Sequence, residues 1–263
     1  MIDLRRRQDG SPLVIGHRGA AALAPENTID GFRAAVAAGV DLVELDVLDL
    51  PRGPLVVAHS KHLEEVSHGA VTGSLRSLTL DELRHTAPGV PTFEEALRFF
   101  AEEAPAVGLH VDLKLHRRLD ELAASIRRLG LEPRTVVSST NAATLRRVAR
   151  HAPDVRIGIT YPHDRLGVSR RPRTWPAVGV ALSAMRASVP SRVAGFLRRA
   201  NATALMLQHR LATPAAVSRA HDLGAAVLAW TVDDPADLER VVAAGVDGVI
   251  TNDPRIFVAT LRA

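Results

Sequence analysis

The 263-residue sequence contains no cysteine, which excludes disulfide bonds, thiolate metal sites and a cysteine nucleophile. It also lacks an uninterrupted run of about 18 apolar residues, the length that a membrane-spanning helix needs. Three arginines charge the segment 1–7, and no apolar stretch of signal-peptide length follows it. We therefore expect a cytoplasmic globular protein.

Lysine and aromatic residues are also scarce. Arginine supplies all but two of the 33 basic residues, and the net charge is +4. Runs such as Arg146, Arg147 and Arg150 are typical of a solvated helical face. Aromatic residues make up 3% of the chain, so stacking platforms for nucleic acid are not expected. The mild positive charge favours a small anionic substrate and leaves contact with a membrane surface open.

The hydrophobic content of 46% is ample for a packed core, and apolar runs alternate with amphipathic segments. The expected strands are 13–15, 42–47, 108–114, 135–139, 156–160, 203–208, 225–231 and 247–251, and the expected helices are 28–38, 80–85, 92–103, 119–129, 141–151, 191–200, 214–223, 235–244 and 254–262. Such alternation favours a closed (β/α)₈ TIM barrel, and we expect a single domain over residues 1–263. An open doubly wound sheet is the alternative, although no nucleotide-binding glycine motif supports it.

The strand 42–47 carries two carboxylates among apolar residues. Because side chains alternate between the faces of a strand, Glu44 and Asp46 point the same way. The segment 109–115 repeats this pattern with Asp112 and Lys114 on one face. Buried charges need a partner, a metal or water, so both strands predict a polar site. In a barrel this site is expected at the carboxyl ends of the strands.

A second extended run, 55–59, follows the carboxylate strand after only about five residues. A parallel crossover needs about a dozen residues, so the two strands are expected to form an antiparallel hairpin. The hairpin would return His59 to the level of Glu44 and Asp46. Residues 60–91 then lack a strong period and indicate an insertion with one short helix, and 162–190 is the other irregular connection.

Seven sequence blocks resemble the glycerophosphodiester phosphodiesterase family from about residue 13 to 255. In chain order they are His17-Arg18-Gly19, Pro25-Glu26-Asn27-Thr28, Glu44-x-Asp46, His59, Asp112-x-Lys114, Trp230-Thr231-Val232 and Gly245-Val-Asp247-Gly-Val-Ile-Thr251. The resemblance implies a TIM-barrel enzyme that hydrolyses glycerophosphodiesters to sn-glycerol 3-phosphate and an alcohol with one divalent cation.

The family's motif implies a role for each matching residue. Glu44, Asp46 and Asp112 would be ligands of Mg²⁺ or Ca²⁺, because hard cations prefer oxygen ligands. His17 and His59 would be the general acid/base pair. Arg18 and Lys114 would hold the phosphate of a small-molecule phosphodiester, and Trp230 would contact the substrate, with core packing as its alternative role.

Four residues depart from the family's pattern, and they include Asp233, where asparagine is more frequent, and Thr140, where an aromatic residue is common. Ser60 follows the second histidine, where an aspartate is usual, and Asp112 replaces the usual glutamate. The Asp112-x-Lys114 block resembles the related sphingomyelinase D-like phospholipases, so a phospholipase D-like enzyme acting on lysophospholipids is one alternative. A catalytically lapsed barrel that binds a phosphodiester is another, and a metal-free network of salt bridges would be the structural reading of the charged residues.

Overall fold

The computed structural model describes residues 1–257 except 52, 68, 70 and 163–174. The parallel strands are β1 (Leu13–Gly16), β2 (Leu42–Asp49), β4 (Gly108–Leu113), β5 (Thr135–Ser139), β6 (Arg156–Tyr161), β7 (Ala204–Gln208), β8 (Ala226–Trp230) and β9 (Gly248–Thr251). Each pairs with its neighbours, and β1 pairs with both β2 and β9, which closes the sheet. The predicted TIM barrel is therefore confirmed, and the open doubly wound sheet is excluded.

Strand β3 (Leu55–Val57) lies outside the barrel and runs antiparallel to β2. Val47 is opposite Val57, and the amide of Ala58 donates to the carbonyl of Asp46. The expected hairpin is therefore confirmed. Its register places His59 directly after the residue that is bonded to Asp46.

Helices cover the outside of the barrel. They are α1 (Ile29–Ala37), α4 (Phe93–Glu102), α5 (Leu119–Arg128), α6 (Ala142–His151), α7 (Trp175–Ala200), α8 (Pro214–Asp222) and α9 (Pro235–Ala243), with the 3₁₀ turns η2 (Glu132–Arg134) and η5 (His209–Leu211). Side-chain oxygens of Thr28, Thr92 and Asn141 accept amide hydrogens in the first turns of α1, α4 and α6. These caps explain why the helices begin close to the predicted positions.

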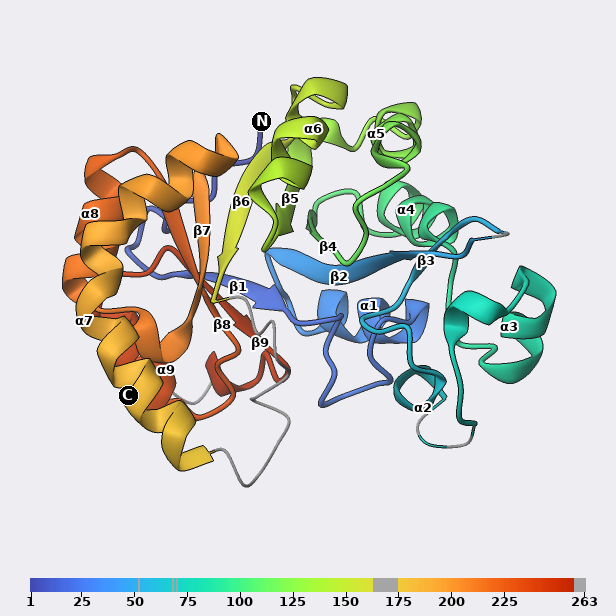
Figure 1. Ribbon diagram of the computed structural model, residues 1–263, viewed down its shortest axis with the longest axis horizontal. Coiled ribbons are helices and arrows are strands. Elements are labelled where there is room, and N and C mark those ends of the chain that lie inside the picture. The colour runs from blue at the N-terminus through green and yellow to red at the C-terminus, as the bar shows by residue number, and fades with distance from the viewer. Residues whose placement is uncertain (52, 68, 70, 163–174, 258–263) are drawn as a thin grey trace.

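The segment 60–91 forms more structure than the sequence indicated. It contains α2 (Leu63–Val66), η1 (Leu75–Ser77) and α3 (Leu80–Thr86), which lie away from α7 and α8 in Figure 1. Leu63, Leu75 and Leu83 are buried in a separate small core with Val56 of the hairpin. Tertiary packing therefore forms turns too short to show a helical period.

The expected irregular connection 162–190 is wrong over its second half. Residues 175–190 belong to α7, although Pro190 lies inside that helix, and residues 163–174 lie outside the described part of the chain. Proline normally predicts a helix boundary because it removes a backbone donor. A helix that begins only at residue 191 is therefore expected, although α7 continues through Pro190. Of the expected last helix 254–262, residues 254–257 lie in the described part of the chain, and 256 and 257 are helical.

The barrel interior changes character along its axis. On β2, Val43, Leu45 and Val47 face the helices and belong to the main core, whereas Glu44 and Asp46 face the interior. At the opposite end the interior is filled by a second apolar cluster, comprising Leu4, Leu13, Ile15, Leu42, Val136, Ala204, Met206, Ala226, Leu228 and Ile250. Within the described strands, the carboxylates of β2 therefore lie toward the carboxyl-terminal mouth of the barrel.

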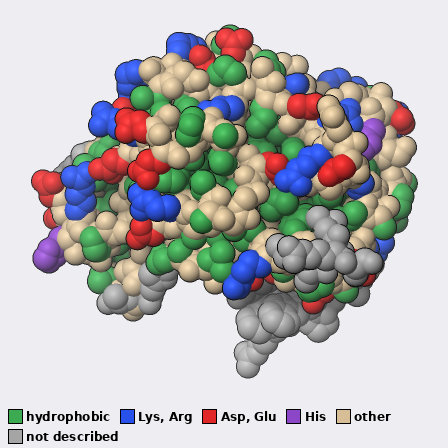
Figure 2. Space-filling model, turned by 180° about the vertical axis from the view of Figure 1, so that it is seen from behind, with side chains coloured by type: hydrophobic (Ala, Val, Ile, Leu, Met, Phe, Trp, Pro, Cys, Tyr) green, Lys and Arg blue, Asp and Glu red, His purple; other side chains and the backbone are tan. Residues whose placement is uncertain are grey.

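The surface carries charged side chains of both signs (Figure 2). Figure 2 shows acidic and basic side chains interspersed on one face of the molecule, and Arg146, Arg147 and Arg150 are exposed as predicted. Within the described residues, none of the helices combines the length and apolar character that crossing a membrane requires.

Candidate active site

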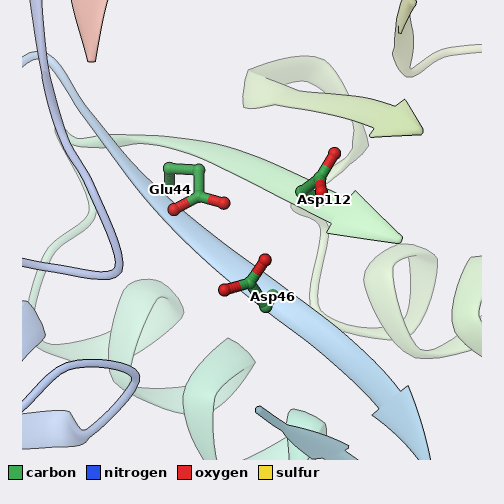
Figure 3. Close-up of side chains that lie close together, drawn as sticks. All are labelled: Glu44, Asp46 and Asp112. Carbon is green, nitrogen blue, oxygen red and sulfur yellow. The ribbon is translucent and has the colours of Figure 1, made fainter. Parts of the chain in front are cut away.

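Three carboxylates meet at the barrel mouth. Glu44 and Asp46 extend from β2 and Asp112 extends from the neighbouring β4, where it is in register with Asp46 (Figure 3). One oxygen of each carboxylate lies within 4.8 Å of the others. Glu44 is 4% exposed and Asp46 1% exposed. The predicted cluster therefore forms, and its buried oxygen donors suit a hard divalent cation.

The loop after β1 brings His17 and Arg18 to this cluster. A Cβ atom on Gly16 would lie 2.2 Å from the carbonyl oxygen of Gly19, so only glycine permits this tight turn. Arg18 has a φ of 52°, and its amide donates to Glu44 Oε2 at 2.8 Å. The turn thus directs one backbone donor of Arg18 at a carboxylate of the neighbouring strand.

Asp46 is the most heavily engaged carboxylate of the site. Its Oδ2 accepts a hydrogen bond from Asn27 Nδ2 at 3.0 Å and lies 3.1 Å from Arg18 Nε, and its Oδ1 lies 3.0 Å from Lys114 Nζ. Arg18 also donates to Glu26 at 2.8 Å. The sequence left Glu26 and Asn27 ambiguous as parts of a helix start, but both contact the site.

Asp112 lies between a cation and several hydroxyl groups. Lys114 Nζ is 2.5 Å from Asp112 Oδ2, and Ser138 donates to Oδ1 of the same carboxylate. His110 Nε2 lies 2.8 Å from Ser138 Oγ, and Nδ1 of the same ring is buried with no hydrogen-bond partner. Because the Ser138 hydroxyl donates to Asp112, His110 Nε2 is the donor of the remaining bond.

His17 is held by residues from the far end of the chain. Its Nδ1 lies 2.7 Å from Asn252 Oδ1, and Asn252 Nδ2 donates to Asp233 Oδ2 at 2.7 Å. The second bond fixes the amide orientation, so His17 Nδ1 carries the proton and Nε2 is left for chemistry. A role for Asn252 could not be predicted from the sequence, because 235 residues separate it from His17.

His59 has a carboxylate partner from the insertion. Its Nδ1 lies 3.1 Å from Glu65 Oε2. Both residues, together with Glu26, line a groove of about 920 Å³ that reaches from the barrel mouth to α3 and the start of α4. The predicted histidine therefore lies where the active site opens into the groove.

Burial and neighbouring charges move the pKa values of these groups. Burial raises the pKa of Glu44 well above its ordinary value, and the Asp46 and Asp112 carboxylates raise it further. Burial would also raise the pKa of Asp46, but Lys114 and Arg18 hold it well below its ordinary value. For Lys114, burial lowers the pKa, and Asp112 and Asp46 more than offset this to give a raised value.

Both candidate catalytic histidines have lowered pKa values. Burial is the main cause for His17, and the positive charge of Arg18 adds to it. Burial also lowers the pKa of His59, where the Asp46 carboxylate opposes the effect. Both rings therefore favour the neutral form near pH 7, which leaves a nitrogen lone pair available.

Trp230 ends β8 at the same mouth of the barrel and packs in part against the second apolar cluster. Its Nε1 is buried without an acceptor, as is Arg18 Nε, which is out of line for a hydrogen bond to Asp46. Native structures leave few buried donors unpaired. Two of the three residues expected to contact the substrate, Arg18 and Trp230, thus each have a buried N–H group without a hydrogen-bond acceptor.

Sequence relatives cover almost the whole chain. Residues 17–256 match the model of the glycerophosphoryl diester phosphodiesterase family. A glycerophosphodiester phosphodiesterase from Caldanaerobacter subterraneus is 29% identical over 264 residues, which cover 95% of this chain and 98% of the relative.

Solved structures agree with the sequence relatives. A candidate glycerophosphoryl diester phosphodiesterase from Silicibacter pomeroyi is 30% identical with a TM-score of 0.77, over 97% of this chain and 96% of that one. A phosphodiesterase from Oleispira antarctica, solved with its product sn-glycerol-3-phosphate, shares the fold at 21% identity and a TM-score of 0.72, over 96% and 97% of the two chains. This chain therefore belongs to the glycerophosphoryl diester phosphodiesterase family, a family of phosphoric diester hydrolases.

Proposed function

We propose that the protein hydrolyses glycerophosphodiesters to sn-glycerol 3-phosphate and an alcohol, with one divalent cation and two histidines. The observation that carries this proposal is a barrel mouth where clustered carboxylates lie beside buried donors that lack acceptors, Arg18 Nε and Trp230 Nε1. A buried donor that is left unpaired costs about 1–3 kcal/mol, and Arg18 Nε offsets part of this cost through its ion pair with Asp46 at 3.1 Å. A substrate rich in oxygen atoms would satisfy both donors.

Glu44, Asp46 and Asp112 would hold the cation, either Mg²⁺ or Ca²⁺. The fit rests on three oxygen donors within 4.8 Å of one another and on the burial of Glu44 and Asp46, because buried carboxylates need a partner. When bound, the cation offsets the negative charge that grows on the phosphoryl oxygens in the transition state.

Arg18 and Lys114 would position the phosphate. Their partial burial and contacts with Asp46 hold both cations at the barrel mouth. Fixed donors of this kind contribute about 2–4 kcal/mol each when they meet charge that develops during the reaction. Trp230 would add its indole N–H, and we assign these three residues to substrate binding.

The two histidines would divide the proton transfers. His17 has a neutral amide partner and lies beside Arg18, which disfavours an imidazolium, so it would act as the base. The pKa of His59 is also lowered, but the Glu65 and Asp46 carboxylates oppose this shift, so of the two rings His59 would be the one that carries the proton as the acid. General acid/base catalysis of this kind contributes about 10²–10⁴-fold.

The nucleophile would be the glycerol 2-hydroxyl of the substrate. His17 takes the hydroxyl proton as the oxygen bonds to phosphorus, while His59 gives a proton to the alcohol oxygen as its bond to phosphorus breaks. Water then opens the cyclic phosphate with the two proton transfers reversed. Phosphorus NMR under rapid turnover should show the cyclic species, and its absence would contradict this route.

One observation favours a second candidate function, a phospholipase D-like reaction on lysophospholipids. The groove beside His59 is lined in part by apolar residues of the insertion, including Val66, Ala87 and Val90. Such a lining accommodates hydrocarbon next to the phosphate site.

We also propose a single domain over residues 1–263. The pairing of β1 with β9 supports this proposal, because it joins the first and the last described strands in one barrel.

Phosphorus NMR tests these functions together. Purified protein is mixed with glycerophosphocholine, glycerophosphoethanolamine and lysophosphatidylcholine, with Mg²⁺, with Ca²⁺ or with excess chelator. We expect metal-dependent loss of the two glycerophosphodiester signals and formation of glycerol 3-phosphate. Loss of the lysophosphatidylcholine signal alone would support the second function. No turnover by folded protein with either metal would favour a barrel that only binds a phosphodiester.

A further inference from the structure

The residue after His59 does not supply the carboxylate that the family usually has there. Ser60 is 8% exposed, and its hydroxyl accepts the amide hydrogen of His62 at 3.1 Å. This local turn leads into α2, where Leu63 is buried. The chain therefore curves back on itself within a few residues of the candidate catalytic histidine.

This turn brings Glu65 to the ring of His59. Glu65 Oε2 lies 3.1 Å from His59 Nδ1, and the two side chains are 33% and 23% exposed. The Glu65 amide donates to the carbonyl of His62, and buried Leu63 anchors the same helix to the small core under the hairpin. The carboxylate is thus held against Nδ1 by packing and by local backbone bonds.

We propose that Glu65 is the positioning residue of His59, in place of the carboxylate that is usual at position 60. Its Oε2 accepts the Nδ1 hydrogen, which fixes the ring orientation and leaves Nε2 for proton transfer. The assignment of His59 to proton transfer rests on the proposed function. The geometry of the Glu65 contact does not.

The surroundings of His59 explain why a carboxylate matters there. The charged groups that act on its ring are Asp46 of β2, the cations Arg18 and Lys114, and Glu65 of α2. Burial and the two cations lower the pKa of His59, whereas Asp46 and the bond to Glu65 raise it. An acid that must be protonated beside two cations therefore gains from a second carboxylate.

The test compares Glu65→Ala with a matched neighbour and with a relocated carboxylate. Glu64→Ala removes the adjacent carboxylate, which instead accepts the amide hydrogen of Gly73. The double variant Ser60→Asp/Glu65→Ala moves the carboxylate to the residue after His59. Each protein is studied by ¹⁵N NMR of labelled histidine without substrate, and by the pH dependence of kcat/KM.

In wild type and Glu64→Ala we expect the His59 signals of a ring protonated at Nδ1. Glu65→Ala should mix the two neutral tautomers, lower kcat about 10–100-fold with little change in KM, and move the basic limb of the pH profile to lower pH. The double variant should recover at least about tenfold of the lost kcat.

Two results would overturn the proposal. One is an unchanged His59 tautomer and pH profile in Glu65→Ala, and the other is an equal effect of Glu64→Ala. If the wild type turns over none of the phosphodiesters, the proposed function fails while the ¹⁵N signals still decide whether Glu65 positions His59. The two hypotheses are therefore tested separately.

Discussion

The two candidate catalytic histidines are held in contrasting ways. The partner of His17 is Asn252, 235 residues away and fixed in turn by Asp233. The partner of His59 is Glu65, six residues away in a four-residue helix of the insertion. The setting of His17 therefore depends on closure of the barrel, whereas that of His59 depends on a small local core.

The largest expected effect comes from removing the Asp46 carboxylate, which contacts both Arg18 and Lys114. Asp46→Asn leaves Arg18 and Lys114 facing each other without the charge that links them. We expect kcat/KM to fall by more than about 10³-fold and the free energy of unfolding to drop by about 3–5 kcal/mol. Phosphorus NMR assays and urea denaturation measure the two losses.

The control for this variant is Asp30→Asn, because Asp30 is exposed and pairs only with Arg33 among the described residues. This variant should keep both its activity and its midpoint of unfolding. An Asp46→Asn protein with near wild-type activity would mean that the carboxylate cluster is structural.

The next effect is the pH dependence of stability that His110, a buried residue of β4, should cause. Burial lowers the pKa of its ring to about 4, whereas the unfolded value is about 6.5. The unfolded chain therefore binds a proton in this range that the folded protein does not. The free energy of unfolding should fall by up to about 3 kcal/mol between pH 6.5 and 4, and the contribution is fully present above pH 6.5.

Urea denaturation across this pH range measures the slope, and His110→Gln provides the comparison. The variant should lose the part of the slope between pH 6.5 and 4 that His110 contributes, up to about 3 kcal/mol in total. A slope equal to that of the wild type would assign the acid sensitivity to other groups, such as His17 and His59, whose pKa values are also lowered.

A smaller loss of activity is expected when the hydrogen-bond partner of His17 is removed. Asn252→Ala removes the acceptor that fixes the His17 tautomer and one of the donors to Asp233. Partners of this kind are worth about 10–100-fold in activity, so we expect kcat to fall by that factor. Asp253→Ala is the matched control, because Asp253 pairs with Arg255 and not with the ring. Equal losses in both variants would mean general damage to the loop.

The smallest expected effect is a difference in the rate of local unfolding between the loop that carries His17 and the insertion that carries Glu65. The amide of His17 donates to Thr251 within the closed barrel, and the amide of Glu65 donates to His62 within the insertion. Short surface elements open at lower free energy than core strands. Hydrogen exchange of Glu65 should be at least about tenfold faster than that of His17. Equal rates would remove the contrast between the two regions.

The strands and the carboxylate cluster could be predicted because they follow from local patterns. Alternating apolar residues place Glu44 and Asp46 on one face, and the short connection to β3 forces the hairpin that returns His59. Neighbouring parallel strands then bring Asp112 beside Asp46. Each step needs only periodicity and loop length.

The contacts that hold the histidines could not be predicted in the same way. Asn252 reaches His17 only because β9 pairs with β1. Glu65 contacts His59 from α2, a helix too short to show a periodic pattern in the sequence. The true start of α7 could not be predicted either, because Pro190 lies inside this helix. These features depend on tertiary packing, which overrides local propensity.

Closure of the barrel also orders events during synthesis. Strand β1 contains the residue before His17, yet one of its two neighbours, β9, is made after the other described strands of the barrel. A nascent chain released before residue 248 therefore keeps the carboxylates and both imidazoles but leaves β1 without β9 and His17 without Asn252. The contact that holds His17 therefore forms only when the barrel closes.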